Sequence, residues 1–353
     1  MTNREWTSPV TLHDVAREAG VSLATASRTL NGSERNVKES NRQLVLAAAE
    51  RLGYTANTSA QAVARGTTTT VALLVGDIAD PYFSSIAAGV VDAAAENGLI
   101  VTMAQTSRDT AREVELVRAM RGQRARAIVL AASRRTPDPH SQALHAELAA
   151  YEAAGGRAVF ITATDAPFRA VPLDNHGGAR DLGNRLHGLG YRNVAVLAGP
   201  GTNPASVAAS DGLRTSGDRL AGFAEAFATA GSPIPAERVV PAAFTRDGGY
   251  QGMRELAERG LDSIDLVFAV NDVMAVGAMS AMRDLGLEPG VDLGLAGFDD
   301  IPTLRDVTPR LTTVRLPLED VGARALALAL ADGDASAELV GTEVIVREST
   351  PGR

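Results

Sequence analysis

The sequence contains no cysteine, only 4% aromatic residues and a single lysine, Lys38. Without cysteine the chain can form no disulfide, no thiolate metal site and no cysteine nucleophile, which is compatible with a reducing compartment. It also has no run of about 18 apolar residues, the length that a membrane-spanning helix needs. The first ten residues, MTNREWTSPV, include no apolar stretch typical of a signal peptide. We therefore expect a cytoplasmic protein without a membrane segment.

The sequence also lacks the motifs that mark common enzyme classes. It has no GxxxxGK(S/T) phosphate loop, no GxSxG nucleophile elbow and no HExxH zinc motif. Gly199-Pro200-Gly201 follows a predicted strand, but the third glycine of a dinucleotide loop is missing. Asp299 and Asp300 are adjacent in a predicted loop, where neighbouring side chains seldom point the same way. We expect no catalytic residue, no cofactor and no metal site.

What the sequence does have is length, apolar material and an uneven charge. Its 353 residues, 45% of them apolar, suffice for two or three folding units. A formal net charge of −8 argues, over the whole chain, against nucleic acid as a partner. Residues 1–66, however, hold eight basic and six acidic side chains, a net charge of +2, and leave −10 for the rest. This division indicates a small basic head on an acidic body.

The head begins with a helical pattern. Thr11 and Asp14 have the spacing of a capping box, in which a hydroxyl and a carboxylate satisfy the first free amides of a helix. An apolar stripe at helical spacing then runs over residues 12–19. Gly20 can end this helix because glycine accepts the left-handed backbone of a tight exit.

Two further helices are predicted in the head. Ser22 can cap a helix from Leu23 to about Leu30, and a third apolar stripe over residues 37–52 ends at Gly53. Two short helices joined by a glycine turn and braced by a third form a helix-turn-helix. In that arrangement the second helix presents its outer residues, from Leu23 to Arg28, to a major groove.

The pattern V-T-L-x-D-V-A-x-x-A-G-V-S-x-x-T-x-S-R-x-L-N over residues 10–31 closely resembles the head of the LacI/GalR family of bacterial transcription regulators. The resemblance implies that the head and the hinge after it bind DNA. The residues that it assigns to this role are Thr11, Ser22, Leu23, Ala24, Thr25, Ser27, Arg28, Asn31, Asn57, Ala60 and Val63.

Residues 55–66 resemble the hinge of the same family with two departures. The family pattern is Tyr-x-Pro-Asn-x-x-Ala-x-x-Leu. This chain has Ala56 in place of the proline and Val63 in place of the leucine. In the family this leucine enters the minor groove at the centre of the site, so the shorter valine should wedge more weakly. Lys38 also stands where the family has a serine that caps the third helix. Without the resemblance, residues 55–66 would read as a plain linker.

The body alternates short apolar runs with helical patterns. The runs span residues 71–75, 127–130, 158–161, 194–197 and 266–270, and helical stretches such as 84–97, 110–121, 177–189 and 219–230 lie among them. Apolar strands separated by helices predict doubly wound parallel sheets covered on both faces. In such sheets ligands bind at the carboxyl ends of the strands.

The body also resembles the effector-binding core of the LacI/GalR family, through motifs such as D-P-Y-F at 80–83, R-L-A-G-F at 219–223 and G-F-D-D at 297–300. The resemblance implies a two-lobed α/β core like that of type I periplasmic binding proteins, behind an all-α head. The expected domains are a helix-turn-helix head at 9–54, a hinge at 55–66 and a core at 67–350. Lobe 1 would span about 67–171 plus 315–334, and lobe 2 about 172–297 plus 335–350.

The resemblance places an effector cleft between the lobes. Arg219 would donate to ligand hydroxyls or a carboxylate, and Asp299 would accept from hydroxyls or ring N–H groups. Aromatic rings would stack on a sugar face or on a base, and an amide could both donate and accept. The expected effector-binding residues are Tyr82, Phe83, Arg219, Phe244, Asn271 and Asp299. One arginine, one aspartate and aromatic rings suit a neutral polyol.

Together these patterns predict a repressor that binds pseudo-palindromic double-stranded operator DNA as a homodimer and responds to a small molecule. A mono- or disaccharide is the favoured effector, and a purine or nucleoside is the alternative. Two other classes of protein share the predicted core: a periplasmic-type sugar-binding protein, and an enzyme built on the same lobes. The head argues against the first, and the missing catalytic motifs argue against the second.

Overall fold

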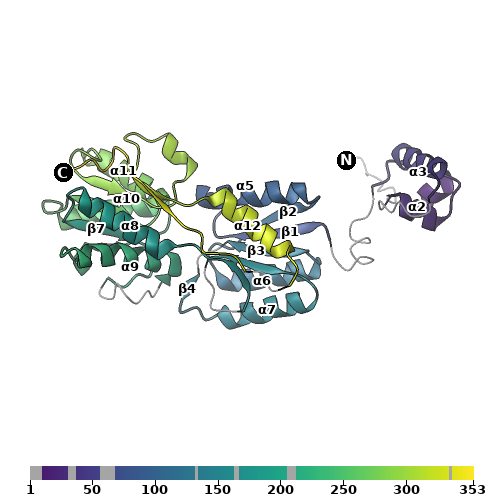
Figure 1. Cartoon of the computed structure of the whole chain (residues 1–353), viewed down its shortest axis with the longest axis horizontal. Coiled ribbons are helices and arrows are strands. Elements are labelled where there is room, and N and C mark those ends of the chain that lie inside the picture. Colours follow the sequence, from purple (N-terminus) through teal and green to yellow (C-terminus); the bar gives the residue numbers. More distant parts are fainter. Residues whose placement is uncertain are drawn as a thin grey trace, which may run out of the picture. The chain divides into compact units, whose positions relative to one another are not determined.

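The computed structural model describes residues 10–30, 37–55, 68–131, 134–162, 167–204, 212–333 and 336–353 (Figure 1). The chain forms two compact units, Met1–Thr68 and Thr69–Arg353. We call the first unit the head and the second the core. None of the helices in the described ranges is long and apolar enough to cross a membrane.

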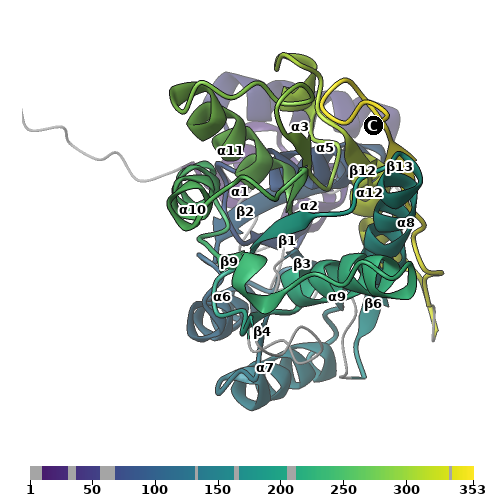
Figure 2. The ribbon, with the colours of Figure 1, turned by 90° about the vertical axis from the view of Figure 1, so that its left-hand side faces the viewer.

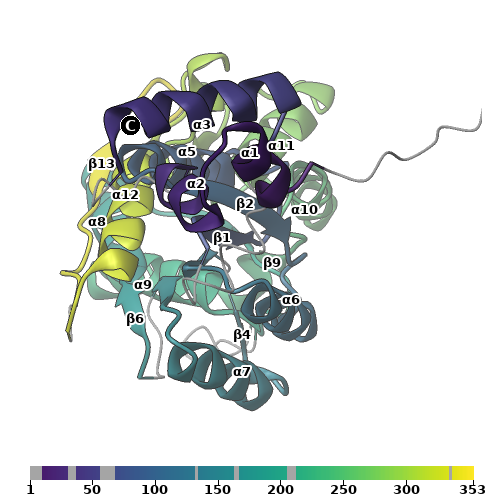
Figure 3. The same ribbon diagram turned by 90° about the vertical axis from the view of Figure 1, so that its right-hand side faces the viewer.

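The head consists of three helices that pack on one another (Figure 3). They are α1 (Leu12–Glu18), α2 (Leu23–Leu30) and α3 (Glu39–Leu52). The predicted capping box is present, because the Thr11 side chain accepts from the Asp14 amide and the Asp14 side chain accepts from the Thr11 amide. Gly20 and Gly53 adopt φ angles of 63° and 61°, the left-handed backbone expected where the first and third helices end. The three-helix prediction is confirmed.

The apolar centre of the head is made of small side chains. Its buried residues are Val15, Ala16, Ala19, Ala26, Val45, Ala48 and Ala49. An exposed ion pair of 3.1 Å between Arg51 and Glu18 also connects α3 to α1. Because alanine and valine bury little area each, this unit gains a modest hydrophobic free energy.

Lobe 1 of the core is built on a five-stranded parallel sheet in the order β2-β1-β3-β5-β6. Its strands are β1 (Thr70–Val75), β2 (Ile100–Gln105), β3 (Ala127–Ala131), β5 (Ala158–Ile161) and β6 (Arg169–Val171). Alternate residues of β1 contribute to different clusters, Leu73 on one face of the sheet and Leu74 on the other. Both faces are therefore buried, which explains the nearly continuous apolar run in the sequence.

Two pairs of helices cover the two faces of this sheet (Figure 1). One pair is α5 (Pro81–Glu96) and α12 (Leu318–Leu330), and the other is α6 (Thr110–Gly122) and α7 (Ser141–Ala153). The backbones of α5 and α12 approach closely, because a Cβ on Gly89 would lie 1.8 Å from the Glu319 carbonyl oxygen. Only glycine permits this approach, and α12 thereby returns to lobe 1 from far along the chain.

Lobe 2 is built on a four-stranded parallel sheet in the order β11-β10-β7-β9. The strands are β7 (Val194–Ala198), β9 (Val239–Pro241), β10 (Leu266–Ala269) and β11 (Gly294–Ala296). The helices are α8 (Asn175–Gly188), α9 (Arg214–Thr229), α10 (Arg246–Arg259) and α11 (Asp272–Asp284), with short 3-10 turns at Ala236–Arg238 and Pro302–Arg305. Helices α8 and α9 pack together on one side, and α10 and α11 on the other (Figure 2). The predicted doubly wound, two-lobed core is confirmed.

Short antiparallel pairs link the two lobes. Strand β12 (Thr313–Arg315) pairs with β13 (Glu343–Ile345) where the chain passes between the lobes. Strand β4 (Arg135–Thr136) pairs with β8 (Gly212–Leu213), so a loop of lobe 1 is hydrogen-bonded to a loop of lobe 2. The carboxyl ends of both sheets lie in the space framed by these links.

Candidate functional site

The outer face of α2 carries the side chains predicted to read DNA. Ser22, Leu23, Ala24 and Arg28 are exposed, and Thr25 and Ser27 are half-buried. The Ser22 hydroxyl accepts the Thr25 amide at 3.1 Å, which confirms that it caps this helix. Thr11 is exposed at the start of α1. Four further candidates, Asn31, Asn57, Ala60 and Val63, lie outside the described residues.

A small cavity of about 30 Å³ lies between the lobes of the core. The residues that line it follow the carboxyl ends of strands in both sheets, as the doubly wound architecture predicts. They are Asp80, Tyr82, Phe83, Arg108, Ala131, Ile161, Thr162, Thr215, Arg219, Phe244 and Asp299. Five of the six predicted effector residues are among them.

Arg219 is the centre of a buried polar network in this cavity. Its Nε donates to Asn175 Oδ1 at 2.9 Å, its Nη1 to the Val270 carbonyl at 2.8 Å, and its Nη2 to Asp299 Oδ1 at 2.6 Å. The guanidinium carbon also lies 4.0 Å from the centre of the Phe298 ring. The side chain is only 1% exposed. Three of its five N–H groups are therefore used within the protein, and two are left for a ligand.

Two buried carboxylates lie on the lobe 2 side. Burial raises the pKa of Asp299, and the neighbouring Arg219 guanidinium opposes that rise. Burial raises the pKa of Asp272 to about 7, although its carboxylate accepts hydrogen bonds from the Thr313 hydroxyl and the Ile301 amide. Asp299 faces the cavity, whereas Asp272 connects the loop behind it to β12.

Aromatic rings close the cavity from both lobes. Tyr82 and Phe83, in the first turn of α5, meet edge to face with ring centres 5.0 Å apart. Phe244 comes from lobe 2, after β9. Asp80 caps α5 by accepting the Tyr82 amide at 3.0 Å, and burial raises the pKa of its carboxyl group. The cavity thus combines apolar ring faces with carboxylates and guanidinium groups.

Asn271 is the predicted effector residue that does not line this cavity. Its side chain accepts the Met274 amide at 2.9 Å and caps α11. The residue is 1% exposed. In this structure its amide therefore supports the start of a helix beside the site.

Sequence reasoning missed four polar residues of the cavity: Asp80, Arg108, Thr162 and Thr215. Arg108, Thr162 and Asp299 all adopt positive φ angles, of 57°, 122° and 120°. Such backbone conformations are costly for residues other than glycine and tend to cluster at functional sites. The sequence signal that could have found them is their place in loops after predicted parallel strands, because a doubly wound sheet binds its ligand there.

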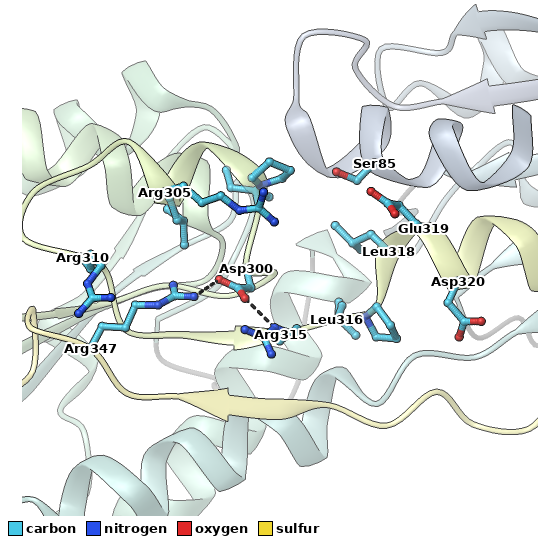
Figure 4. A pocket seen from close by; sticks show the side chains of 14 residues that line it. Ser85, Asp300, Arg305, Arg310, Arg315, Leu316, Leu318, Glu319, Asp320 and Arg347 are labelled. Atoms are coloured by element: carbon cyan, nitrogen blue, oxygen red, sulfur yellow. Dashed lines mark hydrogen bonds and ion pairs between the residues drawn. The ribbon is translucent and has the colours of Figure 1, made fainter. Parts of the chain in front are cut away.

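A larger cavity of about 680 Å³ is also lined by residues of both lobes (Figure 4). It is formed between Ser85 of α5, the first turn of α12 and the loop that contains Asp300 and Arg305. Most of its arginines are already paired within the protein. Asp300 accepts from Arg315 at 2.8 Å and from Arg347 at 2.6 Å, which ties β12 to the end of the chain. Five of the six predicted effector residues line the smaller cavity, at the strand ends, and none of them lines this one.

A helical head with an exposed second helix, joined to a two-lobed core with a polar cavity, defines a ligand-responsive DNA-binding protein. Family models match both parts. Residues 11–57 match the bacterial regulatory proteins of the lacI family, and residues 184–350 match a periplasmic binding protein-like domain. The relatives agree. The transcriptional regulator GalR of Escherichia coli is 34% identical over 91% of this chain and 89% of its own length.

The regulator CelR of Thermobifida fusca is 33% identical over 96% of this chain and 98% of its own length. A solved complex of a CelR regulator with cellobiose has a TM-score of 0.67 at 30% identity, covering 96% of this chain and 99% of that one. A lac repressor dimer bound to operator has a TM-score of 0.79 at 25% identity, covering 98% and 100%. The chain belongs to the lacI family of bacterial regulatory proteins, and its relatives GalR and CelR are transcriptional regulators.

Proposed function

We propose that this chain is a cytoplasmic repressor that binds a pseudo-palindromic operator as a homodimer and is controlled by a sugar that binds between its lobes. Because the cavity of about 30 Å³ holds only one or two waters, the lobes would have to move apart to admit the sugar. The observation that carries the proposal is the composition of that cavity. Phe83 and Phe244 offer ring faces for the C–H face of a pyranose, and Asp299 with the guanidinium groups offers acceptors and donors for hydroxyls. The solved CelR complex with cellobiose supports the choice of a sugar.

The head supports the DNA-binding half of the proposal. Helix α2 exposes two apolar side chains, Leu23 and Ala24, beside the polar Ser22 and Arg28. Apolar side chains can contact thymine methyl groups in the major groove, and arginine can bind guanine or phosphate. Two heads related by a twofold axis would occupy successive major grooves about one helical turn apart. A sugar that changes the relation of the lobes would change how the two heads are presented.

Removal of the head separates the two activities. A variant lacking residues 1–68, the whole first unit, should lose binding to a pseudo-palindromic DNA that the full chain selects in vitro. The same variant should keep the shift in melting temperature that the full chain shows with a sugar. The sugars to screen are D-glucose, D-galactose, D-ribose, D-xylose, maltose and cellobiose.

Two outcomes would contradict the proposal. DNA binding that survives the deletion would refute the role of the head. Stabilisation of the full chain by adenosine or hypoxanthine, and by none of the six sugars, would refute the sugar effector and favour the purine alternative.

A further inference from the structure

Arg108 reaches the cavity from the lobe opposite Arg219. It lies in the loop between β2 and α6, and its side chain is 15% exposed. The guanidinium carbon lies 5.7 Å from the centre of the Phe83 ring and 5.5 Å from the centre of the Phe244 ring. Since Phe83 belongs to lobe 1 and Phe244 to lobe 2, this cation lies between aromatic rings of both lobes.

The outer nitrogens of Arg108 are directed to carboxylates of its own lobe. Nη2 donates to Asp80 Oδ2 at 3.3 Å, and Nη1 lies 3.9 Å from Asp77 Oδ2. The Nε atom is buried and has no hydrogen-bond partner in the described structure. A buried donor without an acceptor is destabilising, and more so when the group is charged. An acceptor oxygen brought by a ligand would remove this cost.

Arg219 provides the contrast within the same cavity. Each of its three nitrogens donates to a protein oxygen, including Nε, which donates to Asn175. Among the described residues, the Nε of Arg108 has no such oxygen, although the two arginines line one cavity. Within the described residues, every guanidinium nitrogen of Arg219 thus donates at least one hydrogen bond to the protein, whereas the Nε of Arg108 donates none.

The backbone of Arg108 is held in an unfavourable conformation. Ser107 and Arg108 have φ angles of 56° and 57°, in the left-handed region that favours glycine. The Thr106 hydroxyl accepts the Arg108 amide at 3.3 Å and helps to fix this turn. Gly76, at the end of β1, makes room, since a Cβ there would lie 3.1 Å from Arg108 Cγ. Strain kept at the rim of a cavity points to a functional reason for the position of the side chain.

We propose that Arg108 is a specificity-determining residue of the effector site, whose Nε–H donates to a hydroxyl or ring oxygen of the bound sugar. This inference rests on the proposed function. The cavity is lined by two guanidinium groups and two carboxyl groups, those of Asp80 and Asp299, whose formal charges balance. A hydroxyl can accept from Nε and donate to a nearby carboxylate, which an anionic group cannot do. The site thus selects a neutral polyol over a sugar acid or a sugar phosphate.

Lysine and glutamine variants of Arg108 test this role in the full chain. Arg108→Lys keeps a positive charge near Asp80 and Asp77 but puts a methylene where Nε stands, and Arg108→Gln removes the charge as well. Both should weaken binding of whichever of the six sugars binds the wild-type chain, by about tenfold or more in isothermal titration calorimetry. The control, Arg112→Gln, changes an exposed arginine of α6 that pairs with Glu115 and should leave the affinity unchanged.

Monodeoxy analogues of the sugar that binds identify the contact. For one analogue, the wild-type chain should lose about tenfold in affinity and Arg108→Lys should lose nothing further, because the partner oxygen is already absent. Unchanged melting temperature and circular dichroism of Arg108→Lys without sugar will show that the variant is folded. If it is not, the same analogue series with Arg108→Gln replaces it.

Three results would overturn the inference. Wild-type affinity in Arg108→Lys would show that the charge alone matters. Equal losses in the wild-type chain and the variant for every deoxy analogue would show that Nε contacts no sugar oxygen. In both cases the wild-type chain still binds a sugar, so the proposed function stands. If none of the six sugars binds the wild-type chain, the proposed function and the role of Arg108 fall together.

Discussion

The head and the core bury very different side chains. The fully buried apolar residues of the head are valines and alanines, with leucines only partly buried around them, whereas the core buries residues as large as Phe160, Phe223 and Phe268 on covered sheets. A unit as small as the head buries a small fraction of its surface and is marginally stable, while a unit of the size of the core has a large reserve. The same loss in free energy of unfolding should therefore unfold much more of the head than of the core. The DNA-binding function rests on the weaker unit.

The same substitution in each unit tests this difference and should produce the largest effect. Val45 in α3 and Val267 in β10 are both fully buried. Truncation of either to alanine should cost about 2–3 kcal/mol through lost burial and the cavity that remains. Because a single small core supplies roughly 3–5 kcal/mol, Val45→Ala should leave the head with about 0–3 kcal/mol of stability and so raise its unfolded fraction strongly. Val267→Ala should leave the core folded.

Calorimetry and DNA binding together measure this outcome. Val45→Ala should weaken binding of the selected pseudo-palindromic DNA and keep the melting transition of the core. Val267→Ala should lower that transition and keep DNA binding. Wild-type DNA affinity in Val45→Ala would show that the head has more reserve than its packing indicates.

The two units also differ in what the sequence could predict. In the head, the signals are local: Thr11 with Asp14 starts a helix, and Gly20 ends it. In the core, the signal is the spacing of apolar residues, which gave the sheets and the place where ligands bind. Both kinds of signal act within a few residues along the chain, and for this reason a single sequence was enough.

The candidate site was predictable only in part, for a physical reason. The resemblance supplied Arg219 and Asp299, which the structure brings to 2.6 Å of each other from segments 80 residues apart. Arg108 carried no such signal, because its importance depends on a left-handed backbone and on a ring from the other lobe. Asn271 differs again: the resemblance predicts a ligand contact, and in the structure its side chain caps α11. Spacing alone cannot distinguish a helix cap from a ligand contact.

A buried carboxyl group of the core, that of Asp272, provides a second test, and its expected effect on stability is of intermediate size. Burial raises the pKa of Asp272 to about 7, above the value of about 3.9 in an unfolded chain. The native state therefore holds this proton more tightly than the unfolded state. The resulting stabilisation is full below about pH 4 and is lost as the pH rises through about 7. We expect the melting temperature of the core to fall between about pH 4 and pH 7.

The variant Asp272→Asn should reduce that fall, because its side chain does not titrate. The matched control is Asp181→Asn, which changes a carboxylate that is 61% exposed and should leave the pH dependence as it is in the wild-type chain. Calorimetry of the variant without residues 1–68 isolates the core. An equal fall in melting temperature for Asp272→Asn and the control would show that Asp272 does not cause it.

The smallest effect, and the one that should strengthen the weaker unit, concerns the start of α3. Lys38 occupies the cap position with an extended backbone, φ −64° and ψ 140°, and its side chain makes no capping hydrogen bond. A serine there can accept a free amide of the first turn, which is worth about 1 kcal/mol. It also removes a positive charge from the positive end of the helix dipole. Lys38→Ser should therefore raise the urea midpoint of the head and leave that of the core unchanged.

Lys38→Ala removes the charge without supplying an acceptor, so it should recover only the smaller, electrostatic share. If alanine stabilised the head as much as serine, charge and not capping would limit the start of α3.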